Sequence, residues 1–248
     1  MINFIVATIK KFIKFFFNLF GVGIYKLKSD ELTKIFTGKG KVKFDVMFDI
    51  GANTGQFSLE IRRKGYNGKI VSFEPLTTAR KKLVQNASKD VNWFVYDQAA
   101  VGDCNGFVDI NISKNSVSSS ILPMLNLHSE AEASSVYIGH EKVPIITLDS
   151  ILKSFLDKSE NCFIKIDTQG YEAQVLDGAI DTLKHTNGIL CELSLFPLYK
   201  GQKLWKEIIN RLEDEGFILW SLEKAFVDIR DGRTLQIDAV FLKKTAIN

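Results

Sequence analysis

The sequence predicts an α/β fold in which helices cover both faces of a mostly parallel sheet. Three observations predict it. Short apolar runs alternate with amphipathic segments of helical length. Several of these runs are apolar throughout, which is typical of parallel strands buried on both faces. Near the end of the chain, two strand-like runs follow one another with no helical segment between them, so we expect a reversed C-terminal strand at or near a sheet edge.

Length and composition fit one domain of this class. A chain of 248 residues with 46% hydrophobic residues can build one large core, and we expect the domain to span residues 41–248 after a helical segment at residues 1–40. A net charge of +3 gives no argument for a nucleic-acid partner. The cysteines, Cys104, Cys162 and Cys191, form no CxxC pair, which predicts neither a zinc site nor a disulfide framework and favours a cytoplasmic location. The sequence sets no oligomeric state.

The first 25 residues are rich in Phe and Ile and leave two main interpretations open. Lys10, Lys11 and Lys14 interrupt the apolar run, which is therefore too short to span a membrane. These lysines stand in the middle of the apolar run, whereas a signal peptide has its positively charged residues before its apolar core. The segment is expected to be an amphipathic helix that caps the domain or covers its active site. The alternative is a peripheral helix on an anionic membrane surface, at the inner face of the membrane. A cleaved targeting segment is a third interpretation.

The elements of the domain follow from the period of their apolar residues. Strand-like runs are apolar throughout, and the segments between them carry apolar residues at helical spacing. Glycine follows the first run directly and proline stops the second. In the first half we expect strand 42–50, helix 54–64, strand 69–73, helix 77–88 and strand 91–96. In the second half we expect strand 162–167, helix 172–185, strand 188–193, helix 204–215, and strands 217–222 and 236–242.

The alternation of strands and helices breaks between residues 103 and 147. Residues 107–113 alternate apolar and polar side chains, as a half-exposed strand does, and residues 143–148 again resemble a strand. The residues between them, 115–136, are rich in serine and give few signals. We therefore expect an insertion that contains a small hairpin and a mobile loop.

A glycine-containing turn follows the first strand and opens the first helix. Gly51 permits a sharp turn beside a ligand, and Gly55 lets the helix pack closely on the strand. Asn53 and Thr54 are suitable helix N-cap residues. Because Asn53 stands where a dinucleotide fingerprint has its second glycine, the turn favours a ligand without a pyrophosphate. Asp49, at the end of the strand, is counted with the turn among the cofactor-binding candidates.

Acidic and polar residues follow the next two strands. Phe73, Glu74 and Pro75 end the second strand, and Glu74 lies 23 residues after Gly51, where an acid can accept hydrogen bonds from ribose hydroxyl groups. After the third strand come three residues at an edge that would face a base. They are Asp97 and Gln98, which could hydrogen-bond the base, and Ala99, which could pack on its ring.

Two further acids are candidates for the reacting centre. Asp167 ends the fourth strand, directly before a polar turn, and Glu192 ends the next strand. Since the carboxyl ends of parallel strands meet at one edge, these two acids should converge with Asp49, Glu74 and Asp97 on one crevice.

At this point the sequence resembles the FkbM family of S-adenosylmethionine (SAM)-dependent methyltransferases. The resemblance runs from about Asp45 to Lys243, in six motifs in order. They are DIGANTG (49–55), FEP (73–75), QAAVGD (98–103), the serine run Ser118, Ser119 and Ser120, IKIDTQGYE (164–172) and CEL (191–193). The resemblance implies a Rossmann-like class I methyltransferase fold and methyl transfer from SAM, usually to a hydroxyl. Family members often act on sugars of polysaccharides, glycolipids or antibiotics. Many of them carry Val-Glu-Gly where this chain has Thr168-Gln169-Gly170, so any charged role at position 169 is weakened here.

Methyl transfer to a hydroxyl group calls for a general base or a metal ion. Asp167 and Glu192 are our candidates, and Asp167 is also expected to contact the cofactor. The predicted site contains no metal, although Mg²⁺ held by these two carboxylates is a weaker alternative. Ser118, Ser119, Ser120 and His140 are candidate substrate-binding residues in the insertion.

Two other functions remain open. An NAD(P)-dependent oxidoreductase can be built on the same fold, although Asn53 in the turn weighs against it. A non-catalytic module that binds SAM and attaches to a membrane through residues 1–25 is the other. The leading hypothesis is O-methylation of a sugar, a glycan or a related small polar acceptor.

Overall fold

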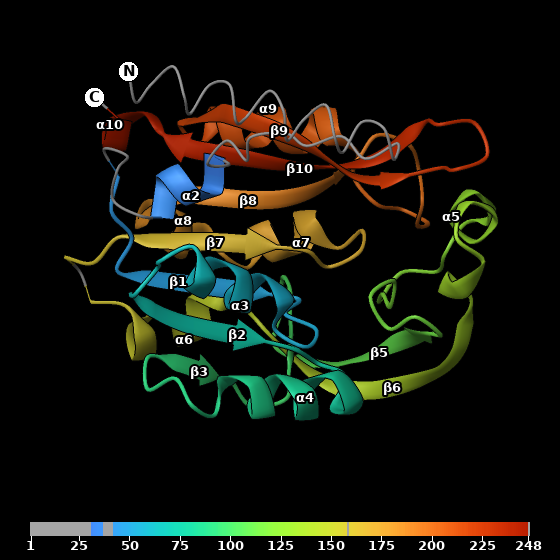
Figure 1. The fold of residues 1–248 in the computed structure, drawn as a ribbon, viewed down its shortest axis with the longest axis horizontal. Coiled ribbons are helices and arrows are strands. Elements are labelled where there is room, and N and C mark those ends of the chain that lie inside the picture. Colours follow the sequence, from blue (N-terminus) through green and yellow to red (C-terminus); the bar gives the residue numbers. More distant parts are fainter. Residues whose placement is uncertain (1–30, 37–41, 158, 248) are drawn as a thin grey trace, which may run out of the picture.

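The computed structural model describes residues 31–36, 42–157 and 159–247 (Figure 1). The expectation for residues 1–25, a lid or a membrane-surface helix, lies outside this part of the chain and stays a prediction. Among the described residues, no helix combines the length and the hydropathy needed to cross a membrane.

A seven-stranded sheet forms the centre of the domain. In sheet order, its strands are β3 (Trp93–Val95), β2 (Lys69–Phe73), β1 (Val46–Ile50), β7 (Cys162–Ile166), β8 (Thr186–Ser194), β10 (Thr234–Lys243) and β9 (Phe217–Val227). Strands β3, β2, β1, β7 and β8 pair in parallel, and β10 is antiparallel to both β8 and β9. The structure therefore confirms a mostly parallel sheet with a reversed C-terminal strand, one place in from the edge (Figure 1).

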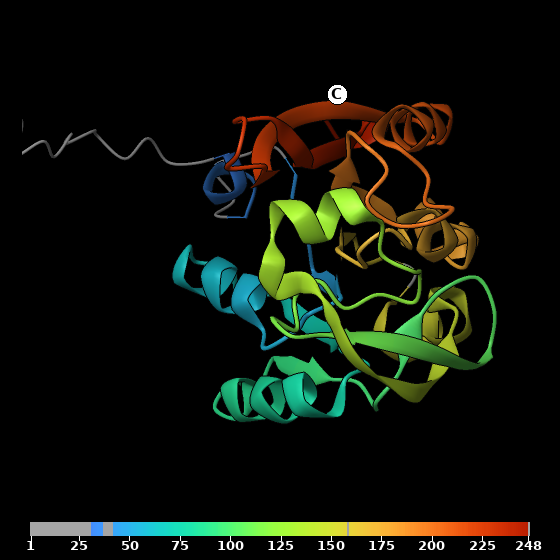
Figure 2. The same ribbon diagram turned by 90° about the vertical axis from the view of Figure 1, so that its right-hand side faces the viewer.

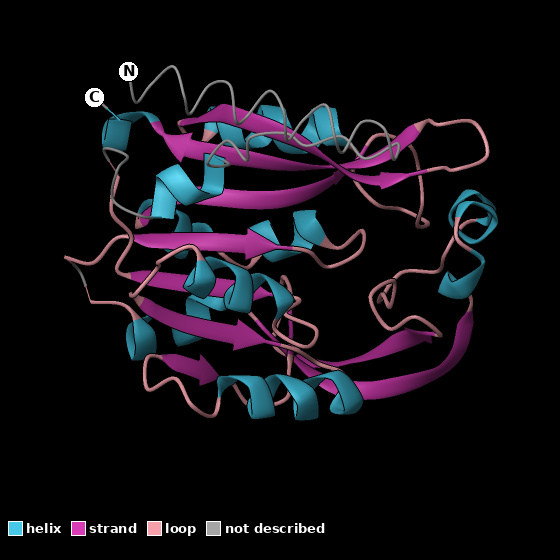
Figure 3. Cartoon of the chain, in the orientation of Figure 1, coloured by secondary structure: helices cyan, strands magenta, loops and turns pink. Residues whose placement is uncertain are grey.

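Helices cover both faces of this sheet and create two cores (Figure 3). One face packs against α2 (Glu31–Phe36), α3 (Gln56–Arg63) and α4 (Thr77–Ala87). The other packs against α6 (Leu148–Phe155), α7 (Glu172–Asp177), α8 (Ile180–Lys184) and α9 (Trp205–Asp214). The short α10 (Lys244–Ile247) follows β10 directly. Strand β7 is buried along its whole length, as the apolar run predicted.

Two strands of the insertion, β5 (Gly106–Ser113) and β6 (Tyr137–Ile146), form a second, three-stranded sheet with β4 (Ala100–Val101), which lies just before the insertion. The order in this sheet is β4, β6 and β5. Strands β5 and β6 are antiparallel, which confirms the predicted hairpin. Their long connection contains α5 (Asn126–Ala131) and the short 3-10 helix η1 (Ala133–Ser135), and it packs back on the chain after β8, where the N–H of Leu125 donates to the carbonyl of Leu198. Figure 2 shows β5, β6 and their connection in front of the edge of the main sheet where the parallel strands end.

Several predicted boundaries were wrong. The first strand begins at Val46, because residues 42–44 have no regular secondary structure and Asp45 forms a bend. The third strand is shorter than expected and ends at Val95. The helix predicted at 172–185 divides into α7 and α8 around Gly178, where a side chain would meet the carbonyl oxygen of Gly102 at 1.9 Å.

Candidate active site

A cavity of about 380 Å³ lies at the carboxyl ends of β1, β2 and β7. Its size falls in the range of roughly 300–1,000 Å³ that is usual for ligand pockets. The wall combines the turn after β1, the end of β2, strand β4, the connection after β5 and the turn after β7. A sheet edge of this kind is where ligands bind in open α/β folds.

The turn after β1 needs glycine at two positions. Gly51 has a φ of 72°, and a side chain there would meet the backbone carbonyl oxygen of Asp167 at 1.9 Å. Gly55 has a φ of 87°, and a Cβ there would lie 2.8 Å from the Leu83 side chain. Gly55 also holds the N-cap position of α3, so the expectation that Asn53 and Thr54 cap this helix was wrong.

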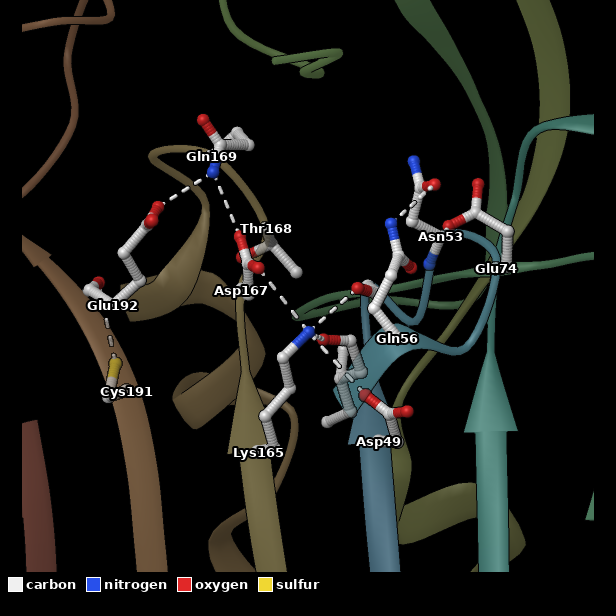
Figure 4. Close-up of polar contacts among 12 residues, drawn as sticks. Asp49, Asn53, Gln56, Glu74, Lys165, Asp167, Thr168, Gln169, Cys191 and Glu192 are labelled. Atoms are coloured by element: carbon white, nitrogen blue, oxygen red, sulfur yellow. Dashed lines mark hydrogen bonds and ion pairs between the residues drawn. The ribbon is translucent and has the colours of Figure 1, made fainter. Parts of the chain in front are cut away.

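The buried carboxylate of Glu74 ties the end of β2 to this turn (Figure 4). Only 4% of Glu74 is exposed, and its two oxygens accept hydrogen bonds of 2.8 Å from the backbone N–H groups of Asn53 and Leu76. Burial raises the pKa of this carboxyl to about 7, although the two backbone donors lower it. Each oxygen keeps a lone pair for a further donor, so Glu74 can still accept hydrogen bonds from a ligand in the cavity.

Lys165 is a site residue that sequence reasoning missed. It stands in the middle of β7, 5% exposed, and its Nζ donates to the carbonyl oxygen of Gly51 over 2.8 Å. The same nitrogen lies 3.4 Å from a carboxylate oxygen of Asp49 and 3.4 Å from one of Asp167 (Figure 4). Burial opposes the charge of Lys165, but the two carboxylates outweigh it and raise its pKa. A lysine inside the otherwise apolar run CFIKI was the available signal.

The turn after β7 contains a second network, centred on Gln169. Its amide nitrogen donates to Asp167 over 2.8 Å and to Glu192 over 2.7 Å (Figure 4). Its amide oxygen accepts a hydrogen bond of 2.8 Å from the hydroxyl of Tyr199. Glu192 also accepts a hydrogen bond from the side-chain amide of Gln236. Burial, followed by the charge of Asp167, raises the pKa of Glu192 well above its ordinary value.

A family model identifies the domain. The model of the methyltransferase FkbM domain matches residues 49–219, more than half of the 248-residue chain. The chain belongs to the FkbM methyltransferase family. This confirms the resemblance found in the six motifs, and the order of the sheet strands agrees with a class I methyltransferase fold. No curated protein matches the sequence significantly.

Solved structures that are similar to this FkbM methyltransferase share little sequence with it. An FkbM methyltransferase from Methylobacillus flagellatus is 11% identical with a TM-score of 0.49, and the match covers 85% of this chain and 47% of that one. A putative RNA methyltransferase from Pyrococcus horikoshii is 12% identical with a TM-score of 0.46 over 87% and 83% of the two chains. A putative tRNA methyltransferase from Streptococcus pneumoniae, in complex with SAM, is 11% identical with a TM-score of 0.47 over 88% and 73%.

The cavity of this FkbM methyltransferase is lined by some, but not all, of the predicted cofactor-binding residues. The predicted cofactor residues in its wall are Gly51, Asn53, Phe73, Glu74, Pro75, Ala99 and Asp167. Those outside the wall that the described residues form are Asp49, Thr54, Gly55, Asp97 and Gln98. Asp49 is fully buried beside Lys165, and Asp97 is exposed, two residues beyond the end of β3. The amide of Gln98 donates to the carbonyl of Pro75 and to Glu141 and is thereby engaged within the protein.

Of the predicted substrate-binding residues, too, some line the cavity and others lie outside its wall. Ser119 and Ser120 are in the wall, together with Ser116, which the sequence did not single out. Ser118 is buried in the connection after β5, where its hydroxyl accepts a hydrogen bond from Asn115. His140 is exposed on β6, outside the wall that the described residues form.

Glu192 is half-buried and does not end its strand as expected, because it lies two residues before the end of β8 and outside the wall that the described residues form. In the described part of the chain, no group of three or more His, Cys, Asp or Glu side chains could hold a metal ion. The amide nitrogen of Gln169 also stands between Asp167 and Glu192, where a shared cation would have to bind. These residues therefore do not fit the Mg²⁺ alternative.

Proposed function

We propose that this FkbM methyltransferase transfers the methyl group of SAM to a hydroxyl group of a sugar or a similar small polar acceptor. The observation that carries the proposal is that one cavity holds the buried acid Glu74 on one side and the partly exposed carboxylate of Asp167 on the other. Asp167 has 35% of its side chain exposed, and the hydroxyls of Ser119 and Ser120 come from the facing connection.

The first side of the cavity has the features that SAM requires. The free lone pairs of Glu74 suit the two ribose hydroxyls, and buried Ala99 offers an apolar surface for the adenine ring. The turn at Gly51 lets the backbone approach the ligand closely. SAM supplies an activated methyl group on its sulfonium.

Asp167 can act as the general base on the other side. The acceptor oxygen gains the methyl group as the bond between that methyl and the sulfur breaks, and S-adenosylhomocysteine leaves as a neutral thioether. The acceptor hydroxyl loses its proton in this step, and the Asp167 carboxylate accepts that proton. The ammonium of Lys165, 3.4 Å away, compensates the negative charge that Asp167 carries before the transfer. The hydroxyl of Ser119 can orient a polyol through a hydrogen bond, whereas the buried hydroxyl of Ser120 already donates to the carbonyl oxygen of Gln169.

The test of the reaction is to incubate the purified full-length chain with SAM and a panel of acceptors. Free sugars, methyl glycosides and nucleotide sugars serve as hydroxyl acceptors, and matched amines serve as the comparison. Mass spectrometry and NMR of the product locate the added methyl group. Methylation of oxygen supports the proposal, whereas methylation of nitrogen only would overturn it.

Glu74→Ala is expected to weaken SAM binding by about 1–3 kcal/mol, because buried hydrogen bonds to the ribose are lost. Isothermal titration calorimetry measures the affinity, with NAD⁺ as a parallel ligand. Thermal unfolding of the variant checks that the loss is not a folding defect, since Glu74 also binds two backbone N–H groups. Binding of NAD⁺ in preference to SAM would instead favour the oxidoreductase hypothesis.

The affinity for SAM is expected to rise with pH as the pH passes about 7, the pKa of Glu74. Below this value the carboxyl is neutral and one oxygen carries a proton, so it accepts fewer hydrogen bonds than the carboxylate formed above it. Titrations on either side of pH 7 measure the change. Glu74→Gln should bind more weakly with a flat pH dependence, and an unchanged slope in this variant would assign the dependence to another group.

A further inference from the structure

The amide of Gln169 lies between two carboxylates that approach the same nitrogen atom. Asp167 is 2.8 Å from it and Glu192 is 2.7 Å from it, so each carboxylate takes one of its two N–H bonds. Burial and the charge of Asp167 both oppose ionisation of Glu192 and raise its pKa. A neutral amide with two N–H donors can hydrogen-bond to both carboxyl groups without adding a charge between them.

The surroundings allow this amide only one orientation. The hydroxyl of Tyr199, which is fully buried, donates to the amide oxygen over 2.8 Å. A flipped amide would direct its oxygen at both carboxylates. The backbone is fixed as well, because Ser120 donates to the carbonyl oxygen of Gln169 over 2.7 Å and Glu172 accepts hydrogen bonds from the N–H groups of Thr168 and Gly170.

Asp167 is thereby held from two sides. One carboxylate oxygen accepts the hydrogen bond from Gln169, and the other lies 3.4 Å from the ammonium of Lys165. Its side chain keeps 35% exposure and lines the cavity. These contacts restrict the direction of the Asp167 carboxylate, and a general base needs a fixed direction toward the hydroxyl that it deprotonates.

We propose that Gln169 is a positioning residue, whose amide bridges Asp167 to Glu192 and so fixes the Asp167 carboxylate in the orientation required for proton transfer from the acceptor. This inference rests on the proposed function, because it concerns the same site. Tyr199 acts through Gln169 by anchoring its amide oxygen. Gln236, which donates to Glu192 but is not bonded to Asp167 among the described residues, offers a matched comparison.

The first experiment needs no acceptor and tests the bridge itself. In protein labelled with ¹⁵N at its seven glutamines, the side-chain signals of Gln169 are those that disappear in Gln169→Met. We expect these amide protons to exchange with water far more slowly than those of Gln85, which is exposed on α4. We also expect the chemical shifts of these protons to change with pH when the carboxyl of Glu192 titrates. If the Gln169 amide protons exchange as fast as those of Gln85 and their chemical shifts do not change with pH, the proposed bridge is wrong.

The second experiment measures kcat, KM and their pH dependence for variants. Gln169→Met should lower kcat by about 10- to 100-fold, the factor for losing a hydrogen bond to a charged group, with little change in the affinity for SAM. Tyr199→Phe should lower kcat less than Gln169→Met does, and Gln236→Met should lower it least of the three variants. A kcat for Gln169→Met equal to that of the wild type would overturn the positioning role.

Gln169→Glu provides the sharpest readout. The new carboxyl would face Asp167, Glu192 and Tyr199 directly, with Glu172, Asp238 and Lys165 close by. When protonated it can replace only one of the two N–H donors, and when ionised it replaces neither. Activity should therefore fall with rising pH along a new limb that the wild type and Gln169→Met lack. The wild-type profile in Gln169→Glu would contradict the inference.

The two hypotheses fail in different ways. If the wild type methylates no hydroxyl acceptor while the Gln169 amide is protected, the proposed function fails and the bridge stands. If the wild type methylates hydroxyls while the Gln169 variants keep its kcat and pH profile, the positioning role fails and the proposed function stands.

Discussion

Asp167→Asn is expected to lower kcat by about 10²- to 10⁴-fold, the range for losing a general base. Asparagine keeps the size of the side chain and can still bond to Gln169, but its amide cannot accept the proton of the acceptor. The measurement is kcat at saturating SAM and acceptor, with SAM affinity measured separately. We expect that affinity to change by no more than about tenfold, which is one hydrogen bond.

Glu192→Gln is the matched control, because Glu192 is the other sequence-predicted base and shares the amide of Gln169. Since it lies outside the cavity wall that the described residues form, its replacement should cost less activity than Asp167→Asn. A larger loss for Glu192→Gln would transfer the role of base to Glu192.

Lys165→Met is expected to lower the free energy of unfolding by about 3–5 kcal/mol, the cost of removing one partner of a buried ion pair. Asp49 is fully buried, and one of its oxygens has no hydrogen-bond partner among the described residues apart from its ion pair with Lys165. The variant therefore leaves a buried charge uncompensated. Urea unfolding monitored by circular dichroism gives the difference.

Two further variants isolate the cause of this loss. Lys184→Met removes a lysine that pairs with Asp181 on the surface, and it should change stability by less than about 1 kcal/mol. Adding Asp49→Asn to Lys165→Met should recover part of the lost stability, because the unpaired charge is removed. A double variant with no recovery would show that lost packing, and not charge, accounts for the effect.

The sequence predicted the frame of this fold because its strands are apolar throughout and its turns carry residues with special conformations. The run VMFDI followed by Gly51 located both β1 and the edge where the cavity lies. Glu74 was found in the same way, as an acid directly after a buried strand. In both cases a short stretch of chain contains the whole signal.

The missed features depend on contacts between distant segments. The run CFIKI singles out Lys165, but its pairing with Asp49 became visible only through the register of β1 and β7. Gln169 gains its partners from β8 and from the segment that carries Tyr199. The need for glycine at position 178, between α7 and α8, comes from the close carbonyl of Gly102, far away in sequence. No local pattern contains these distances, so no local pattern could predict them.

The place of β10 between β8 and β9 has a consequence for how the chain is made. A ribosome delivers β1, β2, β3 and β7 early, so the strands around Glu74 can pair while synthesis continues. Strand β10 is synthesised after every other strand, yet it occupies an interior position and brings Gln236 to Glu192. The strands that carry Glu74, Asp167 and Glu192 can therefore pair before β10 is made, whereas the hydrogen bond from Gln236 to Glu192 forms only after β10 has joined the sheet.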